Sequence, residues 1–168
     1  GERLRVDRVA FTNVPAYVVA GGHVVTIGTR ELRVDLASGG TLHAIVDSEA
    51  TGIPLDPAAI PELRRLAAQI RRATEQTPTV REHGGLDSVI FTGPPNDPEA
   101  HLRNVAVAAS GAVDRSASAT GTSAVMAVLD AMGLLQDDQP FVHESLVGTL
   151  HRGMVARRTQ VSEVPAIV

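Results

Sequence analysis

The feature that most constrains this fold is the stretch from Asp114 to Leu135, in which a polar turn of small residues leads into an apolar segment. Between Val125 and Leu135 the only charged residue is Asp130, so a helix here has almost no polar face. Such a helix is stable only when it is buried. We therefore predict a central helix wrapped by β-strands.

The turn before this segment, residues 114–124, consists mostly of small residues, namely serine, threonine, alanine and glycine. Small residues let backbone N–H groups approach a ligand closely, and the first turn of a helix leaves several N–H groups unpaired at its positive end. Together these properties favour binding of a carboxylate or phosphate. A turn of this composition is also typical of an ordinary helix cap, so the pattern alone is compatible with a purely structural role.

The composition narrows the class of protein. The 168 residues are 43% apolar with a net charge of −4, which suits a globular protein with one sizeable core. The sequence has neither the basic excess of a nucleic-acid-binding protein nor an apolar run near the ~20 residues of a membrane span. The lack of cysteine excludes disulfides and thiolate catalysis by this chain and favours a cytoplasmic location. The six histidines lack metal-ligand spacing, so we expect no metal site.

Short apolar and alternating segments predict a sheet around the central helix. The strands are expected at residues 4–11, 23–27, 31–36, 42–47, 86–92, 102–108, 141–148 and 154–161, with residues 21–22 as a hairpin turn. Asp56-Pro57 predicts a helix start, because a capping carboxylate precedes a proline whose missing N–H is not needed there. The apolar face of this helix is expected to lie on the sheet and comprises Ile60, Leu63, Leu66, Ala67 and Ile70.

Three strings, in order along the chain, resemble motifs of the proline racemase family. Residues 114–124 read D-R-S-A-S-A-T-G-T-S-A and match eight of the eleven positions of the family's second active-site motif, D-R-S-P-C-G-T-G-T-S-A. The three departures are Ala117 for proline, Ser118 for the catalytic cysteine and Ala119 for glycine. Residues 35–47 resemble the family's D-x-A-x-G-G-x-x-x-A-I-V-D block, and residues 141–148 resemble its F-x-x-E-S-x-x-G string.

The resemblance implies an α+β fold, a diaminopimelate-epimerase-like lobe in which a curved, mostly antiparallel sheet wraps a buried central helix. Residues 1–168 would form a single domain, one lobe of a normally two-lobed enzyme with its active site between the lobes. The family's other catalytic cysteine lies in a first lobe, in a Met-Cys-Gly-His-Gly-like string that this sequence lacks. The expected partners are therefore that missing first lobe and a small imino acid substrate, with no nucleic acid or membrane, and the sequence is compatible with a homodimer.

The resemblance also implies a cofactor-independent reaction that removes the α-proton of a proline-like imino acid. Ser118 occupies the position of the catalytic acid or base, and Asp114 would accept a hydrogen bond from the ring ammonium of the substrate. The backbone amides around Ala119, Thr120 and Gly121 would hold the substrate carboxylate and stabilise the charge that develops on it.

The serine at position 118 separates three alternatives. Family members with threonine there resemble trans-3-hydroxyproline dehydratases, and serine is chemically closer to threonine than to cysteine, so a dehydratase is the first expectation. The first alternative is a proline racemase or 4-hydroxyproline epimerase, and the second is a non-catalytic relative that keeps the fold. A serine hydroxyl is a weak acid or base without a partner. Because a two-sided reaction also needs the other lobe, we expect this chain alone to be inactive.

Overall fold

The computed structural model describes residues 9–136 and 138–168, which form one nine-stranded sheet in the order β7-β6-β5-β4-β3-β2-β1-β9-β8. The strands are β1 (Ala16–Ile27), β2 (Arg30–Ser38), β3 (Leu42–Asp47), β4 (Ser88–Gly93), β5 (Leu102–Ala108), β6 (Phe141–Glu144), β7 (Leu150–Gly153), β8 (Arg158–Val161) and β9 (Val164–Ile167). The pairs β3–β4 and β5–β6 are parallel, and the other neighbouring pairs are antiparallel.

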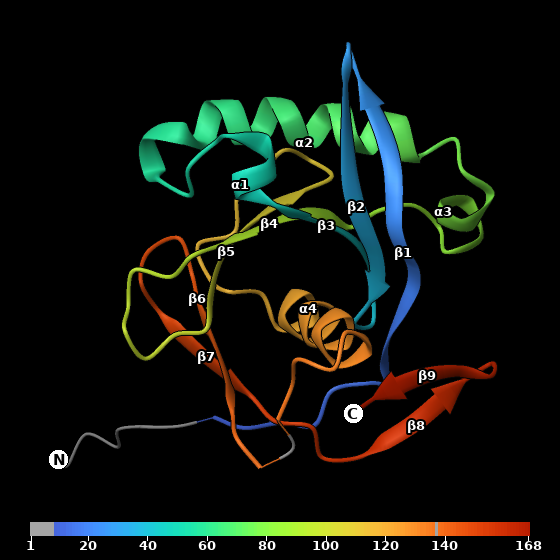
Figure 1. Ribbon diagram of the computed structural model, residues 1–168, viewed down its shortest axis with the longest axis vertical. Helices are drawn as coiled ribbons and strands as arrows, with labels where there is room; N and C mark the ends of the chain where they lie inside the picture. Colours follow the sequence, from blue (N-terminus) through green and yellow to red (C-terminus); the bar gives the residue numbers. More distant parts are fainter. Residues whose placement is uncertain (1–8, 137) are drawn as a thin grey trace, which may run out of the picture.

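The sheet curves around helix α4 (Ala119–Ala131), and Figure 1 shows strands above the helix, to its left and to its right, with β8 and β9 to the lower right. Residues 124–128 of the helix are buried, which confirms the predicted α+β lobe with a wrapped central helix. The helix does not extend to Leu135. Gly133 adopts φ +71° and ends it, and Met132 and Leu134 beside it are 64% and 62% exposed.

Helix α2 (Ile60–Thr74) packs on the opposite face of the sheet, called here the outer face; the inner face packs against α4 (Figure 1). Strand alternation sends neighbouring side chains to opposite faces. In β4, for example, Val89 and Phe91 join the α2 core, whereas Ile90 joins the α4 core. The predicted helix start is confirmed: Asp56 caps the short 3-10 turn η1 (Pro57–Ala59) that leads directly into α2.

Several expected elements differ from those observed. The expected hairpin at residues 21–22 is wrong, because β1 runs through it with a register irregularity and Gly22 N–H donates to the Asp35 carboxylate. The hairpin turn lies after β1 instead, where Gly28 has φ +62°.

Short elements were also missed. Two small helices, α1 (Ser48–Thr51) and α3 (Pro78–Glu82), were not expected, and the C-terminal part forms three short strands instead of one at residues 154–161. Residues 4–8 of the expected first strand lie outside the described residues, and residues 9–15 are not in a strand. Within the described ranges, no helix combines the length and apolar character needed to cross a membrane.

Candidate functional site

The predicted site lies in the turn that leads from β5 into α4. Asp114 N–H donates to the Ala106 carbonyl, which ties the start of the turn to the sheet. One oxygen of the Asp114 carboxylate accepts hydrogen bonds from Ser116, from its N–H at 2.8 Å and from its hydroxyl at 2.9 Å. Asp114 is exposed, and no partner within the described residues is recorded for its other oxygen. That oxygen is available to accept a hydrogen bond from a ligand.

Ser118 is the N-cap of α4 and has an unusual backbone conformation, with φ +57° and ψ +124°. A residue other than glycine in such a region costs about 1–3 kcal/mol, so the surroundings must hold it there. Its N–H donates to Ser116 Oγ at 3.1 Å, and its carbonyl accepts from Thr122 N–H at 2.8 Å. Its own Oγ accepts from Gly121 N–H at 3.2 Å. The hydroxyl expected to do chemistry therefore also caps the helix.

The free amide donors at this helix end are fewer than the sequence suggested. The N–H groups of Ser118 and Gly121 are engaged within the turn, so Gly121 does not offer a free N–H in this structure. Ala119 and Thr120 are the first residues of the helix and have no intrahelical acceptor. No other acceptor for their N–H groups is recorded among the described residues. Two adjacent amides at the positive end of α4 are thus available to an anion.

The glycine pair at residues 39–40, in the segment 35–47 that resembles the second family motif, packs against this turn. Gly39 lies so close to α4 that a Cβ atom on it would sit 2.0 Å from the Thr120 carbonyl oxygen. Asn13 bridges the same two segments, donating to the Gly39 carbonyl at 3.0 Å and to Ser123 Oγ at 2.8 Å. The glycine pair at residues 39–40 therefore has a positional reason: only a residue without a side chain lets the helix start this close to β2.

A buried polar chain lies beneath the turn and was not anticipated from the sequence. Asn104 Nδ2 and Thr122 Oγ1 both donate to the Ala117 carbonyl, at 2.9 Å and 3.0 Å, and His143 Nδ1 lies 3.1 Å from Thr122 Oγ1. Burial, with a smaller contribution from the neighbouring His151, lowers the pKa of His143 to about 3, so the ring is neutral. The sequence did not single out Asn104 or His143, because each meets the turn only through the position of a distant strand, β5 for Asn104 and β6 for His143.

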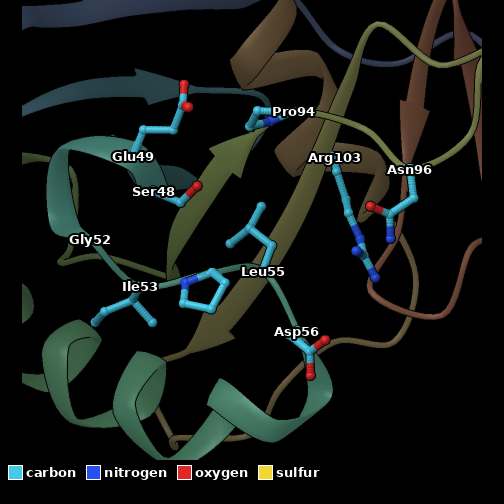
Figure 2. Close-up of a pocket in the computed structure, with 10 residues that line it drawn as sticks. Ser48, Glu49, Gly52, Ile53, Leu55, Asp56, Pro94, Asn96 and Arg103 are labelled. Atoms are coloured by element: carbon cyan, nitrogen blue, oxygen red, sulfur yellow. The ribbon is translucent and has the colours of Figure 1, made fainter.

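A cavity of about 540 Å³ lies away from this turn, at the ends of β3 and β4, and contains none of the predicted site residues. Figure 2 shows Ser48 and Glu49 on one side of it and Asn96 and Arg103 on the other. Arg103 is paired with Glu144 at 3.8 Å, and Glu144 in turn accepts the N–H groups of Asn96 and Asp97. These contacts fix the loop after β4 and give the buried ion pair a structural role.

The comparisons with known proteins agree on one family. A family model described as "Proline racemase" matches residues 2–168. The chain is 37% identical over 169 aligned positions to the 4-hydroxyproline epimerase of Brucella ovis and, equally, to the 4-hydroxyproline 2-epimerase of Brucella suis biovar 1. Each alignment covers 97% of this chain and 51% of the relative, so the chain spans about half the length of these proteins.

Two solved structures share the fold. One is a probable proline racemase from Agrobacterium radiobacter K84 with bound carbonate, which superposes with a TM-score of 0.83 at 25% identity and covers 93% of this chain and 47% of that one. The other is a hydroxyproline epimerase from Agrobacterium vitis with bound trans-4-hydroxy-L-proline, with a TM-score of 0.81 at 27% identity, covering 92% and 46%. The match extends over nearly all of this chain and about half of each neighbour.

Proposed function

Because this chain belongs to the proline racemase family, we propose that it forms one lobe of a two-lobed enzyme that inverts the α-carbon of a proline-like imino acid. The observation that carries the proposal is the match over residues 2–168, together with the position of the family's motif at the N-terminus of the buried helix α4. The named relatives and the neighbour with bound trans-4-hydroxy-L-proline favour 4-hydroxyproline as the substrate.

The residues of this lobe have distinct roles in the proposed reaction. The amides of Ala119 and Thr120 bind the substrate carboxylate, where negative charge develops when the α-proton leaves. The unoccupied oxygen of Asp114 accepts a hydrogen bond from the ring ammonium. Ser118 faces the α-carbon from this lobe as the acid that returns a proton, while a base from the other lobe removes one from the opposite face.

An epimerase replaces the dehydratase that the serine at position 118 first suggested. The relatives reported above are named as epimerases or racemases, and none of these names indicates a dehydratase. The similarity of serine to threonine concerns a single side chain, whereas the epimerase relatives align over 97% of the chain.

A second candidate function is a non-catalytic member of the family that binds an imino acid without converting it. The observation that favours it is the environment of Ser118. Its Oγ accepts the Gly121 N–H, and no titratable side chain among the described residues is recorded in contact with it. Without a partner base, a serine hydroxyl ionises far less readily than a cysteine thiol near neutral pH.

The deciding experiment uses the complete product of the gene that encodes this chain. The protein is incubated with trans-4-hydroxy-L-proline in D₂O, and proton NMR follows exchange at Cα and formation of cis-4-hydroxy-D-proline. Epimerisation by the unaltered protein supports the proposed enzyme. The variant Ser118→Cys restores a thiol and should raise the epimerisation rate by about tenfold or more, because a thiol is the better acid near neutral pH.

Other outcomes separate the alternatives. Exchange at Cα without inversion would mean that only the opposite face carries a competent group. Binding of the substrate without exchange, in both the unaltered protein and the Ser118→Cys variant, would establish the non-catalytic candidate instead. Formation of a dehydration product from trans-3-hydroxy-L-proline would restore the dehydratase. The 168-residue chain alone should turn over none of these compounds.

A further inference from the structure

The buried polar chain beneath the turn has an arrangement that stability alone does not explain. Asn104 and His143 are fully buried, and Thr122 is 6% exposed. Buried polar groups are destabilising unless they are hydrogen-bonded. Among the described residues, Asn104 Oδ1 and His143 Nε2 have no hydrogen-bond partner. Apolar side chains of similar size would fill the same space without leaving such atoms unpaired.

The positions of the protons in this buried polar chain of Asn104, Thr122 and His143 can be assigned from their contacts. The Thr122 hydroxyl has one proton and donates it to the Ala117 carbonyl at 3.0 Å. Its contact with His143 Nδ1 at 3.1 Å therefore requires that the ring nitrogen be the donor. The neutral imidazole then carries its proton on Nδ1 and leaves Nε2 unprotonated. The result is a directed chain in which His143 donates to Thr122, and Thr122 donates to the backbone.

The buried polar chain binds the peptide group between Ala117 and Ser118. Two side chains donate to the oxygen of this peptide, which is the Ala117 carbonyl, and its N–H donates to Ser116 Oγ. The next peptide group is held as well, because the Ser118 carbonyl accepts from Thr122 N–H. Both peptides that flank Ser118 are therefore fixed, and Ser118 keeps the positive φ that places its Oγ over the first turn of α4.

We propose that Asn104, Thr122 and His143 are positioning residues of the candidate site, which hold the Ala117–Ser118 peptide so that Ser118 and the amides of Ala119 and Thr120 face the ligand. The inference rests on the proposed function for the identity of the ligand, but the backbone geometry at Ser118 can be tested without one. If the chain of hydrogen bonds is cut, Ser118 relaxes toward a common conformation and the two amides turn away from their shared direction.

The central test compares Thr122→Val with Thr122→Ser. Valine keeps the shape of threonine and removes the hydroxyl, whereas serine keeps the hydroxyl. The matched control is Thr74→Val in α2, because Thr74 is also buried and its hydroxyl also donates to backbone carbonyls, on the outer face of the sheet. Thr122→Val and Thr74→Val should lower stability to a similar extent, which separates positioning from folding.

The first readout is the conformation of Ser118 in the 168-residue chain. The ¹³Cα and ¹³Cβ shifts and the amide–α-proton coupling of Ser118 report its φ. They should move toward values for negative φ in Thr122→Val, and remain near the wild-type values in Thr122→Ser and Thr74→Val. Unchanged Ser118 signals in a folded Thr122→Val variant would overturn the proposal, whatever the ligand.

The second readout is binding of pyrrole-2-carboxylate, a planar ring carboxylate that mimics the deprotonated substrate, followed through the amide signals of Ala119 and Thr120. Thr122→Val should weaken binding about tenfold, because a small misplacement of two donors affects both contacts. Thr122→Ser should recover most of it. Equal weakening by Thr74→Val would reduce the role to general stability. No binding by the unaltered chain would count against the proposed ligand site, while the Ser118 signals still decide the positioning role.

The histidine end of the chain has its own matched pair. His143→Asn places an amide N–H near the position of Nδ1 and should preserve the donor to Thr122, whereas His143→Gln places its amide nearer the position of Nε2. We expect wild-type Ser118 signals in the asparagine variant and shifted signals in the glutamine variant. Wild-type Ser118 signals in both variants would exclude His143 from the network.

Discussion

The outer and inner faces of the sheet each pack against one helix, but the two interfaces are built from different kinds of side chain. On the outer face, Leu63, Ala67 and Ile70 of α2 belong to one core with apolar residues of β1 to β5. On the inner face, the apolar part of α4 packs in a second core, but the first turns of the helix are made of small residues next to buried polar groups, among them Asn104 and His143. The outer face is an ordinary apolar core, whereas the inner face combines an apolar core with buried polar groups that hold a backbone turn in place.

The helix starts show the same contrast. Asp56 caps η1 from an ordinary extended conformation, with φ −125°. Ser118 caps α4 with φ +57°. Strain of this kind persists where neighbouring contacts over-determine the backbone, and it is concentrated at functional sites. We therefore expect substitutions on the two faces to have different effects. A substitution on the outer face should lower stability only, whereas one on the inner face should also alter the backbone conformation of the turn at Ser118.

The largest effect is expected from one substitution on each face. Leu63→Ala should lower the free energy of unfolding by about 3 kcal/mol, because Leu63 is fully buried and its loss leaves a cavity. Gly39→Ala should lower it by about 3 kcal/mol or more, because the new Cβ would meet the Thr120 carbonyl and push α4 from β2. Urea unfolding measures both values.

The two variants should differ in ligand binding. Gly39→Ala should abolish the shifts of the Ala119 and Thr120 amides with pyrrole-2-carboxylate, and Leu63→Ala should preserve them. A control is Gly21→Ala in β1, whose Cβ would have only an ordinary contact at 3.8 Å, and this variant should change neither property. Equal loss of binding in the Leu63→Ala variant would break the distinction between the faces.

A smaller effect is expected from acid, and it should belong to the inner face. Burial lowers the pKa of His143 from 6.5 to about 3, and it also lowers the pKa of His43, although Asp87 opposes this second shift. Each buried ring binds its proton more readily in the unfolded state. Stability is therefore complete above pH 6.5 and decreases as the pH falls toward 3, by about 2 kcal/mol between pH 7 and 5 for His143 alone.

The variant that checks this assignment is His143→Asn, which cannot titrate in this range. Its free energy of unfolding, measured by urea titration at pH 7, 6 and 5, should depend less steeply on pH than that of the unaltered chain. The remaining slope should fall again when His43 is also replaced. An unchanged slope in His143→Asn would mean that other groups cause the acid sensitivity.

The smallest effect separates the two helix caps by its sign. Two effects of Ser118→Gly lower stability: the loss of the hydroxyl cap, which costs only a few tenths of a kcal/mol when glycine replaces it, and the greater flexibility of the unfolded state. A third effect raises stability, because glycine relieves the strain at φ +57°. We expect a net gain of about 0.5 kcal/mol in the free energy of unfolding. Asp56→Gly loses a cap with no strain to relieve and should be less stable than the unaltered chain. Losses of similar size in both would show that Ser118 is not strained.

The sequence by itself determined the parts of this fold that depend on local pattern. The apolar run after Ser123 required a buried helix, and the alternation in residues 31–36 required a strand with one buried face. The Asp56-Pro57 pair set the start of the outer helix. The motif at residues 114–124 pointed to the family that the comparisons found. The roles of Asp114, Ser118, Ala119, Thr120 and Gly121 remain predictions, because no ligand contact tests them.

Only the tertiary structure decided how the turn is held. The hydrogen bond from Asn104 to Ala117 depends on the position of β5. The contact of His143 with Thr122 depends on the position of β6, which pairs in parallel with β5. These partners are separated along the chain, so no local period or spacing encodes their meeting. The same limit applies to Gly39, whose close approach to Thr120 is set by the curvature of the sheet around α4. Residue type fixes what a side chain can donate or accept, but the packing of distant strands decides which group it meets.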